Sequence, residues 1–247
     1  MTQEISLTAV LLAGGLGTRL RTVVSDRPKV LAEVCGRPFI TYLLDELSKA
    51  WVSESVLATG YLAEQIEDCL GNSYGGMRIK YSREKERRGT GGAVRYALPA
   101  VSNPLVLVMN GDSFCEVDLN GFIKAHVESG AKVSMVVRKV DDTGRYGRVE
   151  LSESHRVLAF EEKSGEKAGP GWINAGIYLF AREVLEAIHN EGEVSMEREV
   201  LPQRISLGVQ GFCSSGRFID IGLPDTLEEA QTFFANWERC AETIGCG

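Results

Sequence analysis

Residues 8–19 read TAVLLAGGLGTR, and the fold class follows from this stretch. Its first part, from Thr8 to Leu12, is a short and almost wholly apolar run, which is typical of a strand buried on both faces. Three glycines follow, at positions 14, 15 and 17. Because glycine lacks a Cβ atom, backbone N–H groups in such a loop can approach an anion closely. The stretch therefore predicts a buried strand that ends in an anion-binding turn.

Apolar runs of strand length alternate with segments of helical period along the first half of the chain. The strand-length runs lie at residues 55–59, 77–81, 105–109 and 133–137, and the segments of helical period at 40–47, 62–70, 93–98 and 122–127. A β-α-β-α order is typical of parallel strands joined by crossover helices. It predicts a three-layer α/β fold in which helices cover both faces of a mostly parallel sheet.

The second half of the chain mixes strands, turns and helices. Strands are expected at 146–151, 157–160 and 172–180, a charged loop at 161–171, and helices at 182–189, 196–206 and 224–237. Neither a linker-like change of composition nor a repeat of fixed period interrupts the chain. We therefore expect the second half to extend the same, partly mixed sheet, so that residues 1–247 form a single domain.

The composition is that of an ordinary globular protein. Of 247 residues, 27 are basic and 34 acidic, so the formal net charge is −7, and 44% are hydrophobic. These values exclude a disordered chain and a basic protein that coats nucleic acid. No apolar run approaches the ~18 residues of a membrane span, and the first residues lack the pattern of a signal peptide. The 6 cysteines include no C-x-x-C pair, and their even number leaves a disulfide framework open. In a chain of this length without a secretion signal, we expect buried, reduced thiols and a cytoplasmic location.

Cationic residues follow the glycine-rich loop. Arg19 offers a planar fork of donors that suits phosphate oxygens, and Arg27-Pro28-Lys29 brings two more cations. The dinucleotide-binding fingerprint requires Gly or Ala where Leu20 stands, and the loop has no Gly-Lys pair for a P-loop. Both of these phosphate motifs therefore fail. From the glycines alone, a tight turn with solvated arginines is an equally good interpretation.

The order Leu-Ala-Gly-Gly-x-Gly-Thr-Arg-Leu, followed by Pro-Lys, resembles the sugar-1-phosphate nucleotidylyltransferases, and the resemblance extends over nearly the whole chain. It implies a Rossmann-like nucleotide-binding core of the nucleotide-diphospho-sugar transferase type. It also implies that a nucleoside triphosphate is held by the first half, about residues 1–115, and a sugar phosphate by about 116–247. The residues that the resemblance assigns to the triphosphate are Leu12, Ala13, Gly14, Gly15, Gly17, Thr18, Arg19, Lys29, Gly89, Thr90 and Asn110.

A second glycine cluster, Gly89-Thr90-Gly91-Gly92, precedes a predicted helix. A purely structural interpretation is that Gly89-Thr90 caps the N-terminus of that helix. The resemblance implies that backbone groups near Gly89 read the edge of the base. A pocket made of backbone atoms leaves the choice of base weakly encoded in the sequence.

Two aspartates are candidates for a metal site. Asp112 lies at the carboxyl end of the run 105–109, where ligands of open α/β sheets bind, and Asp220 alternates with Ile219 and Ile221. Taken alone, each aspartate is equally suited to a turn or a helix cap. The resemblance implies that both hold Mg²⁺, a hard cation that suits carboxylate and phosphate oxygens.

The charged loop and the strand after it carry the expected sugar-phosphate site. Glu162 can accept hydrogen bonds from hydroxyls, and Lys163 is a point charge for a phosphate. The alternative is a solvated turn. The resemblance assigns Gly147, Glu162 and Asn174 to the sugar and Lys163 to its 1-phosphate, and it assigns catalysis to Arg19, Lys29 and Lys163. Ser195 at the start of the 196–206 segment is interpreted as a helix cap.

The resemblance implies that the chain transfers a nucleotidyl group to a sugar 1-phosphate and releases pyrophosphate, without nucleic acid or membrane as a partner. Within the resembled family, the chain length, GTGGA over 89–93 and FIDIGLPD over 218–225 look most like the members that use GTP with D-glycero-D-manno-heptose 1-phosphate. Mannose 1-phosphate with GTP and N-acetylmuramic acid 1-phosphate with UTP are the alternatives. A non-catalytic sensor that binds a nucleotide sugar is a further alternative, and the chain could form a homodimer. Leu20, at a position where the dinucleotide-binding fingerprint requires Gly or Ala, argues against a dehydrogenase.

Overall fold

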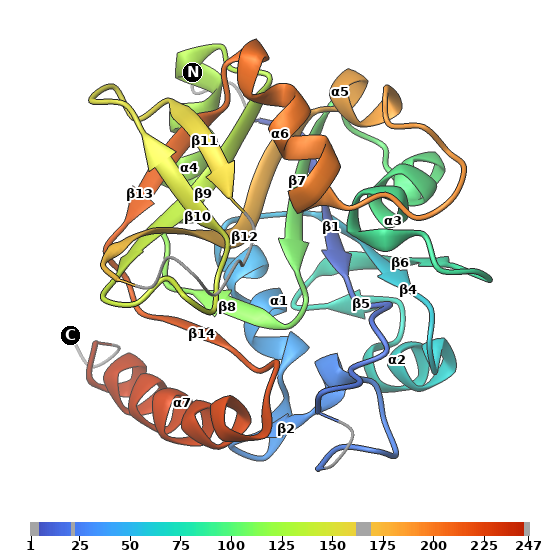
Figure 1. Ribbon diagram of the computed structural model, residues 1–247. Coiled ribbons are helices and arrows are strands. Elements are labelled where there is room, and N and C mark those ends of the chain that lie inside the picture. Colours follow the sequence, from blue (N-terminus) through green and yellow to red (C-terminus); the bar gives the residue numbers. More distant parts are fainter. Residues whose placement is uncertain (1–4, 21–22, 162–168, 245–247) are drawn as a thin grey trace.

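The computed structural model describes residues 5–20, 23–161 and 169–244, with side chains as far as residue 235. Its centre is a sheet of ten strands with the order β11-β10-β12-β7-β1-β4-β6-β5, which β9 and β13 join through β12 (Figure 1). Strand β1 (Leu7–Leu12) lies in the middle, parallel to β7 (Leu105–Asn110) and to β4 (Glu54–Thr59). Beside β4, β6 (Met77–Arg83) continues the parallel set. The α/β fold expected from the alternating pattern is confirmed.

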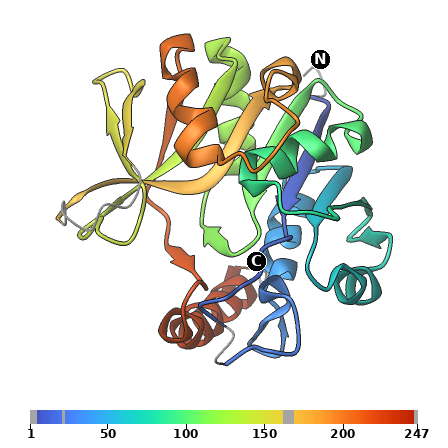
Figure 2. The same ribbon diagram turned by 45° about the vertical axis from the view of Figure 1, so that its right-hand side comes forward.

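The second half adds antiparallel strands, which make the sheet mixed. Strand β12 (Gly171–Ala181) pairs antiparallel with β7 and β10 (Arg148–Leu151) along one edge and with β9 (Val133–Val140) along the other. Strand β13 (Gln210–Ser214) runs parallel to β9, and β11 (Val157–Glu161) pairs with β10. In Figure 2 the yellow strands β10 and β11 extend away from the rest of the sheet.

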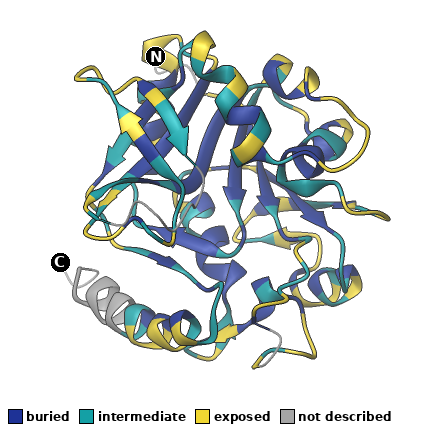
Figure 3. Ribbon diagram, in the orientation of Figure 1, coloured by how far each residue is buried: buried dark blue, intermediate teal, exposed yellow. Residues whose placement is uncertain are grey.

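Helices cover both faces of the sheet because strand side chains alternate between the faces. In β1, Ala9 and Leu11 belong to one hydrophobic core and Val10 to the other. The first core is closed by α1 (Ile40–Lys49), α2 (Ala63–Leu70), α4 (Leu119–Ser129) and α7 (Pro224–Ile244). The second is closed by α3 (Gly89–Ala97), α5 (Arg182–Glu186) and α6 (Leu201–Arg204). Figure 3 shows the central strands as a buried layer between these helices.

Two parts of the second half differ from the sequence-based expectation. The helix predicted for 196–206 consists of three short pieces: a π-helical turn η3 (Met196–Val200), α6, and a 3-10 turn η4 (Ile205–Leu207). Pro202 lies in the first turn of α6, where its missing N–H cannot continue the hydrogen bonding of the preceding turn. Strand β13 is absent from the prediction because its sequence, QGFCS, has no regular apolar alternation.

Aromatic contacts anchor helix α7. The ring of Phe234 stacks on Tyr42 with centroids 3.8 Å apart. It also meets Phe114 edge-on at 5.0 Å, and such aromatic pairs contribute ~0.5–1.5 kcal/mol beyond their burial. Phe114 belongs to β8 (Ser113–Cys115), which pairs antiparallel with β14 (Phe218–Asp220), directly before α7. The packing of α7 therefore holds β14 against β8.

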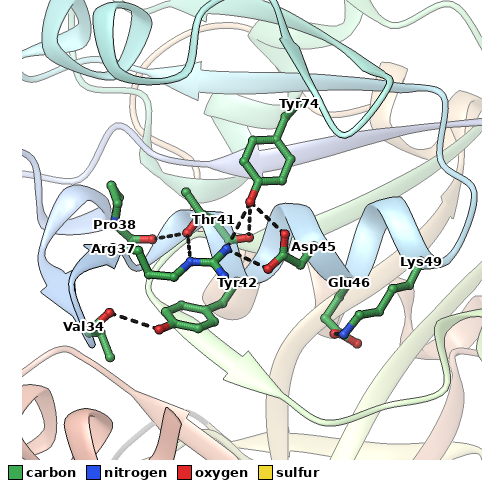
Figure 4. Close-up of polar contacts among 9 residues, drawn as sticks. All are labelled: Val34, Arg37, Pro38, Thr41, Tyr42, Asp45, Glu46, Lys49 and Tyr74. Carbon is green, nitrogen blue, oxygen red and sulfur yellow. Dashed lines mark hydrogen bonds and ion pairs between the residues drawn. The ribbon is translucent and has the colours of Figure 1, made fainter. Parts of the chain in front are cut away.

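A polar cluster holds the hairpin of β2 (Glu33–Val34) and β3 (Arg37–Pro38) against the first turns of α1 (Figure 4). Arg37 donates to Thr41 Oγ1 at 2.8 Å and pairs with Asp45 at 2.7 Å. Tyr74, in β5 (Ser73–Tyr74), donates to Asp45 at 2.7 Å. Burial and the neighbouring Asp45 carboxylate raise the pKa of Tyr74 to about 12, so its phenol stays a donor.

Within the described residues, no helix is long and apolar enough to cross a membrane. The cysteines described there, Cys35, Cys69, Cys115 and Cys213, are free thiols. Cys115 is buried, as expected, but Cys69 is exposed. The expectation of buried thiols is therefore wrong for Cys69, which lies on the solvent side of α2.

Candidate functional site

Two cavities open beside the carboxyl ends of β1 and β7, and Asn110 lines both. The larger has a volume of about 310 Å³; the predicted residues on its wall are Leu12, Gly14, Gly15, Lys29, Gly89, Thr90, Asn110 and Asp112. The smaller has a volume of about 150 Å³; the predicted residues on its wall are Asn110, Gly147, Asn174 and Asp220. This edge of an open α/β sheet is where ligands bind.

The turn after β7 requires a glycine. The N–H of Gly111 donates to Leu12 O at 3.0 Å, and a Cβ atom on Gly111 would lie 2.5 Å from that oxygen. Any larger residue would push the ends of β1 and β7 apart. Gly111 therefore sets Asp112 directly beside the glycine-rich loop.

Lys29 and the two aspartates gather between the cavities. Lys29 Nζ donates to Asp112 Oδ2 at 2.7 Å, and the Lys29 side chain is only 13% exposed. The pairing of β14 with β8 brings in Asp220, and Ile221 N donates to Asp112 O at 2.9 Å. A Cβ atom on Gly222 would lie 2.5 Å from Asp220 Oδ1 and 3.3 Å from Lys29 Nζ, so both groups border the same small space.

The backbone of Val194 closes the N-terminus of α3, on the wall of the larger cavity. Gly91 N and Gly92 N donate to Val194 O at 2.8 and 3.2 Å, and Val194 N donates to Arg88 O at 2.7 Å. Gly89 has a φ of +68°, and a Cβ atom there would lie 2.5 Å from Val194 O. Backbone geometry thus requires glycine at position 89, whereas its role in reading a base stays a prediction.

Glu197 connects the two cavities. Thr90 Oγ1 donates to Glu197 Oε2 at 2.8 Å, and the Tyr178 hydroxyl donates to Glu197 Oε1 at 3.5 Å. Asn174 Nδ2 donates to the same hydroxyl at 2.5 Å. Burial, reinforced by the Glu197 charge, raises the pKa of Tyr178 well above its usual value. One carboxylate therefore links Thr90 of the larger cavity to Asn174 of the smaller, while Ser195 caps the η3 turn as predicted.

Glycines and amides shape the smaller cavity. Gly176 has a φ of +73°, and a Cβ atom there would lie 2.7 Å from Asn110 Nδ2. A Cβ atom on Gly147 would lie 2.9 Å from the Phe160 ring. Asn174 Oδ1 accepts a hydrogen bond from Gly176 N at 2.9 Å, whereas Asn110 Oδ1 is buried without a partner among the described residues. Amides that donate and accept in this way suit a ligand rich in hydroxyl groups.

Some predicted residues lie elsewhere. Four residues of the glycine-rich segment line neither cavity: Ala13, Gly17, Thr18 and Arg19. The side chains of Thr18 and Arg19 are exposed, and their contact with phosphate stays a prediction. Glu162 and Lys163 lie outside the described residues.

Three acidic residues that line the cavities were not predicted from the sequence: Glu84 and Glu193 in the larger one and Glu197 in the smaller one. Burial raises the pKa of Glu84 to about 7; the Arg88 charge opposes this shift and the Glu193 charge adds to it. All three acids stand among other charged residues, so the sequence offers only a weak signal. Near Glu197, the pattern that the sequence does show is the helix cap at Ser195.

The donor set suits a hard cation held together with anionic ligands. Asp112, in the turn just before β8, and Asp220, in the strand β14 that pairs with β8, supply carboxylate oxygens, which fits Mg²⁺. Among the described residues no group of three or more His, Cys, Asp or Glu could hold a metal ion. Oxygens of ligands or water would therefore complete the shell of an ion at this place.

Comparisons with known proteins agree with this geometry. Residues 8–236 match the family model described as nucleotidyl transferase. The D-glycero-alpha-D-manno-heptose 1-phosphate guanylyltransferase of Aneurinibacillus thermoaerophilus is 36% identical over 226 residues, which cover 91% of this chain and 97% of the relative. The mannose-1-phosphate guanylyltransferase of Mycobacterium tuberculosis is 34% identical, over 88% of this chain and 61% of the relative. The crystal structure of HddC from Yersinia pseudotuberculosis complexed with GMP-PN has a TM-score of 0.80 and 32% identity, over 92% of this chain and 99% of the other.

Proposed function

This chain belongs to the nucleotidyl transferase family, and we propose that it joins GTP to D-glycero-alpha-D-manno-heptose 1-phosphate, giving GDP-heptose and pyrophosphate. The observation that carries the proposal is the pair of cavities that meet at Asn110, with Asp112 on the wall of one and Asp220 on the wall of the other. The match to the Aneurinibacillus relative over almost its whole length supports the heptose substrate.

The proposed reaction needs no general base. A phosphate oxygen of the sugar 1-phosphate attacks the α-phosphorus of GTP, the bond between the α- and β-phosphates breaks, and pyrophosphate leaves. The second pKa of a phosphate monoester is ~6, so the nucleophile is already anionic at neutral pH. The protein has to overcome the repulsion between two anions and align them in line. Lys29 supplies countercharge between the cavities, and Arg19 and Lys163 are proposed to add to it.

Mg²⁺ is part of the proposal. Asp112 and Asp220 would hold it, and when bound it would neutralise part of the charge on the phosphates. The Lys29 ammonium, 2.7 Å from Asp112, holds that carboxylate in place and offsets its charge. The two aspartates and Lys29 would otherwise leave a net negative charge facing anionic substrates.

We propose that the triphosphate occupies the larger cavity and the sugar phosphate the smaller one. The expected division into a nucleotide half (1–115) and a sugar half (116–247) is then not strict, since Glu193 lines the larger cavity and Asn110 the smaller. A single catalytic domain acting on free metabolites of the cytoplasm is part of this proposal.

Pyrophosphate release, measured with four nucleoside triphosphates against a panel of sugar 1-phosphates, tests the proposal. The highest kcat/KM is expected for GTP with heptose 1-phosphate. A higher value with mannose 1-phosphate would favour the second candidate, which the Mycobacterium relative supports although the chain covers only 61% of it. A higher value with UTP and N-acetylmuramic acid 1-phosphate would contradict the choice of base. No release with any pair, together with tight binding of a nucleotide sugar, would leave a non-catalytic sensor.

A further inference from the structure

A third cavity, here called the α3 cavity, lies beside the second half of helix α3 and has a volume of about 440 Å³. Its wall consists of residues 81–83 at the end of β6, residues 95–97 of α3, residues 99 and 100 in the turn η2 (Leu98–Ala100), and Asn190. None of these residues lines the larger or the smaller cavity. A volume of this order is typical of pockets that hold small molecules.

Arg95 brings a guanidinium without a partner to the wall of the α3 cavity. Its Nε atom is buried and donates no hydrogen bond to the described part of the chain. Its side chain also forms no ion pair with any described residue. A buried donor that has lost its hydrogen bonds to water and gained none in return disfavours the folded state. An anion that accepts a hydrogen bond from Arg95 would remove this cost.

The wall of the α3 cavity is cationic, although the protein as a whole is acidic. Arg83 is its second cation, and among the described residues that line the cavity none is acidic. Arg83 pairs with Glu64, but that pair lies at the surface, with side chains that are 51% and 63% exposed. The formal net charge of the chain is −7, so this wall departs locally from the overall sign. Such a patch attracts anions.

The side chains on the wall suit a phosphate ester. A guanidinium donates through a planar fork that fits two oxygens of one phosphate group. A phosphate monoester carries nearly two negative charges at neutral pH, which matches the two arginines. Tyr81 and Tyr96 contribute aromatic side chains to the same wall, and aromatic rings provide apolar surface for the organic part of a ligand.

Arg88 and Tyr96 separate the α3 cavity from the larger cavity. Arg88 lines the larger cavity, and its guanidinium carbon lies 4.4 Å from the centre of the Tyr96 ring, which lines the α3 cavity. Arg88 Nη1 also donates to Asn190 O at 3.2 Å. The two cavities therefore share a wall but no lining residue, and a ligand in one leaves the lining residues of the other free.

We propose that the α3 cavity is a separate ligand site, which binds a phosphate ester through the guanidinium of Arg95, with Arg83 as additional countercharge. The site uses none of the residues that the proposed function assigns to its substrates. It therefore does not depend on which triphosphate and which sugar 1-phosphate the chain uses.

Isothermal titration calorimetry tests the proposal on the wild type, Arg95→Gln and Arg78→Gln. Arg78 is the matched control, because it lies on β6 as Arg83 does, is exposed, and lines none of the three cavities. The probes are AMP, glucose 6-phosphate and inorganic phosphate. Arg95→Gln removes hydrogen bonds between charged groups and should weaken binding of the preferred ester about 10- to 100-fold. Arg78→Gln should match the wild type.

The order of the three probes identifies the source of the ester. Tighter binding of AMP would assign the site to a nucleotide, and tighter binding of glucose 6-phosphate to a sugar phosphate. Inorganic phosphate that binds as tightly as both esters would contradict an ester site, and so would equal affinities of the wild type and Arg95→Gln. The kcat of pyrophosphate release should be unchanged in Arg95→Gln, since Arg95 lines neither the larger nor the smaller cavity. If no triphosphate is used at all, the proposed function fails, but the calorimetry still decides this inference.

Amide hydrogen exchange of the wild type gives a test that does not depend on the folding of any variant. The preferred ester should slow exchange at residues 81–83 and 95–100, which form the wall of the α3 cavity. Slower exchange confined to the glycine-rich loop and residues 110–112 would place the ester in the larger cavity and overturn the inference.

Discussion

Replacement of Gly89 by alanine should test how the wall of the larger cavity is built. Gly89 has a φ of +68°, and the new Cβ atom would lie 2.5 Å from Val194 O and 2.9 Å from Val194 C. Both are backbone atoms, so no side-chain rotation can relieve the contact. Gly130, which ends α4 with a φ of +64° and has no atom within 4 Å of a Cβ atom, is the matched control.

The two substitutions separate backbone strain from steric overlap. The left-handed conformation costs an L-residue ~1–2 kcal/mol, which applies to both positions. At Gly89 the Val194 backbone must also move. This movement would weaken or break three hydrogen bonds, those from Gly91 N and Gly92 N to Val194 O and that from Val194 N to Arg88 O. Each such bond contributes ~1 kcal/mol. Gly89→Ala should therefore cost about 4–5 kcal/mol of unfolding free energy, against about 1–2 kcal/mol for Gly130→Ala.

Urea unfolding followed by circular dichroism measures both variants against the wild type. Gly89→Ala should also weaken GTP binding, because the displaced segment carries Glu193 on the cavity wall. Equal losses of unfolding free energy at positions 89 and 130 would show that the Val194 contact adds nothing to the strain. In that case the requirement for glycine at the N-terminus of α3 would not come from the Val194 backbone.

Three further predictions concern the reaction and its pH dependence. Asp112→Asn should raise the Mg²⁺ concentration needed for half-maximal pyrophosphate release and lower turnover, whereas an unchanged Mg²⁺ titration would exclude Asp112 as a ligand. Glu197→Gln weakens charge-assisted hydrogen bonds worth ~1.5–3 kcal/mol. Initial rates should therefore give kcat/KM values about 10- to 100-fold lower for both substrates. A loss of kcat/KM for the triphosphate alone would contradict the link of Glu197 to the smaller cavity. Burial lowers the pKa of His126 below its ordinary 6.5, so the unfolded state binds more protons and wild-type stability falls as pH drops below that value. Denaturation curves at several pH values should show a smaller loss of stability at low pH for His126→Asn than for the wild type, and equal losses in the two proteins would contradict this reasoning.

The parts of the fold and site that could be predicted are those with strong local patterns. Strands β1 and β7 are mostly apolar because both faces are covered, and the polar residues that follow the apolar runs mark the ligand edge of the sheet. Glycines 14 and 15 and Asp112 were found in this way, and all three line the larger cavity together with Asn110, which the family resemblance assigned.

Other site residues could not be predicted because their surroundings in the sequence are misleading. Glu84 stands in REKERR, a stretch that reads as a solvated turn. Its burial arises only when β6 lies beside β4 and the chain around Glu193 folds over the cavity. Glu197 likewise follows a helix cap, and its contacts with Thr90 and Tyr178 join segments far apart in the sequence.

Local sequence was enough to specify the α/β class, the glycine-rich turn after the first strand, and the aspartate at the end of β7. These features depend on a few consecutive residues and on the backbone conformations open to them. The approach of Asp220 to Asp112 and Lys29, and the link that Glu197 makes between the cavities, depend instead on tertiary structure. The first contact exists because Phe234 of α7 packs on Tyr42 and Phe114 and thereby holds β14 against β8. Such proximity results from the burial of apolar surface between distant segments, and no local pattern of residues encodes it.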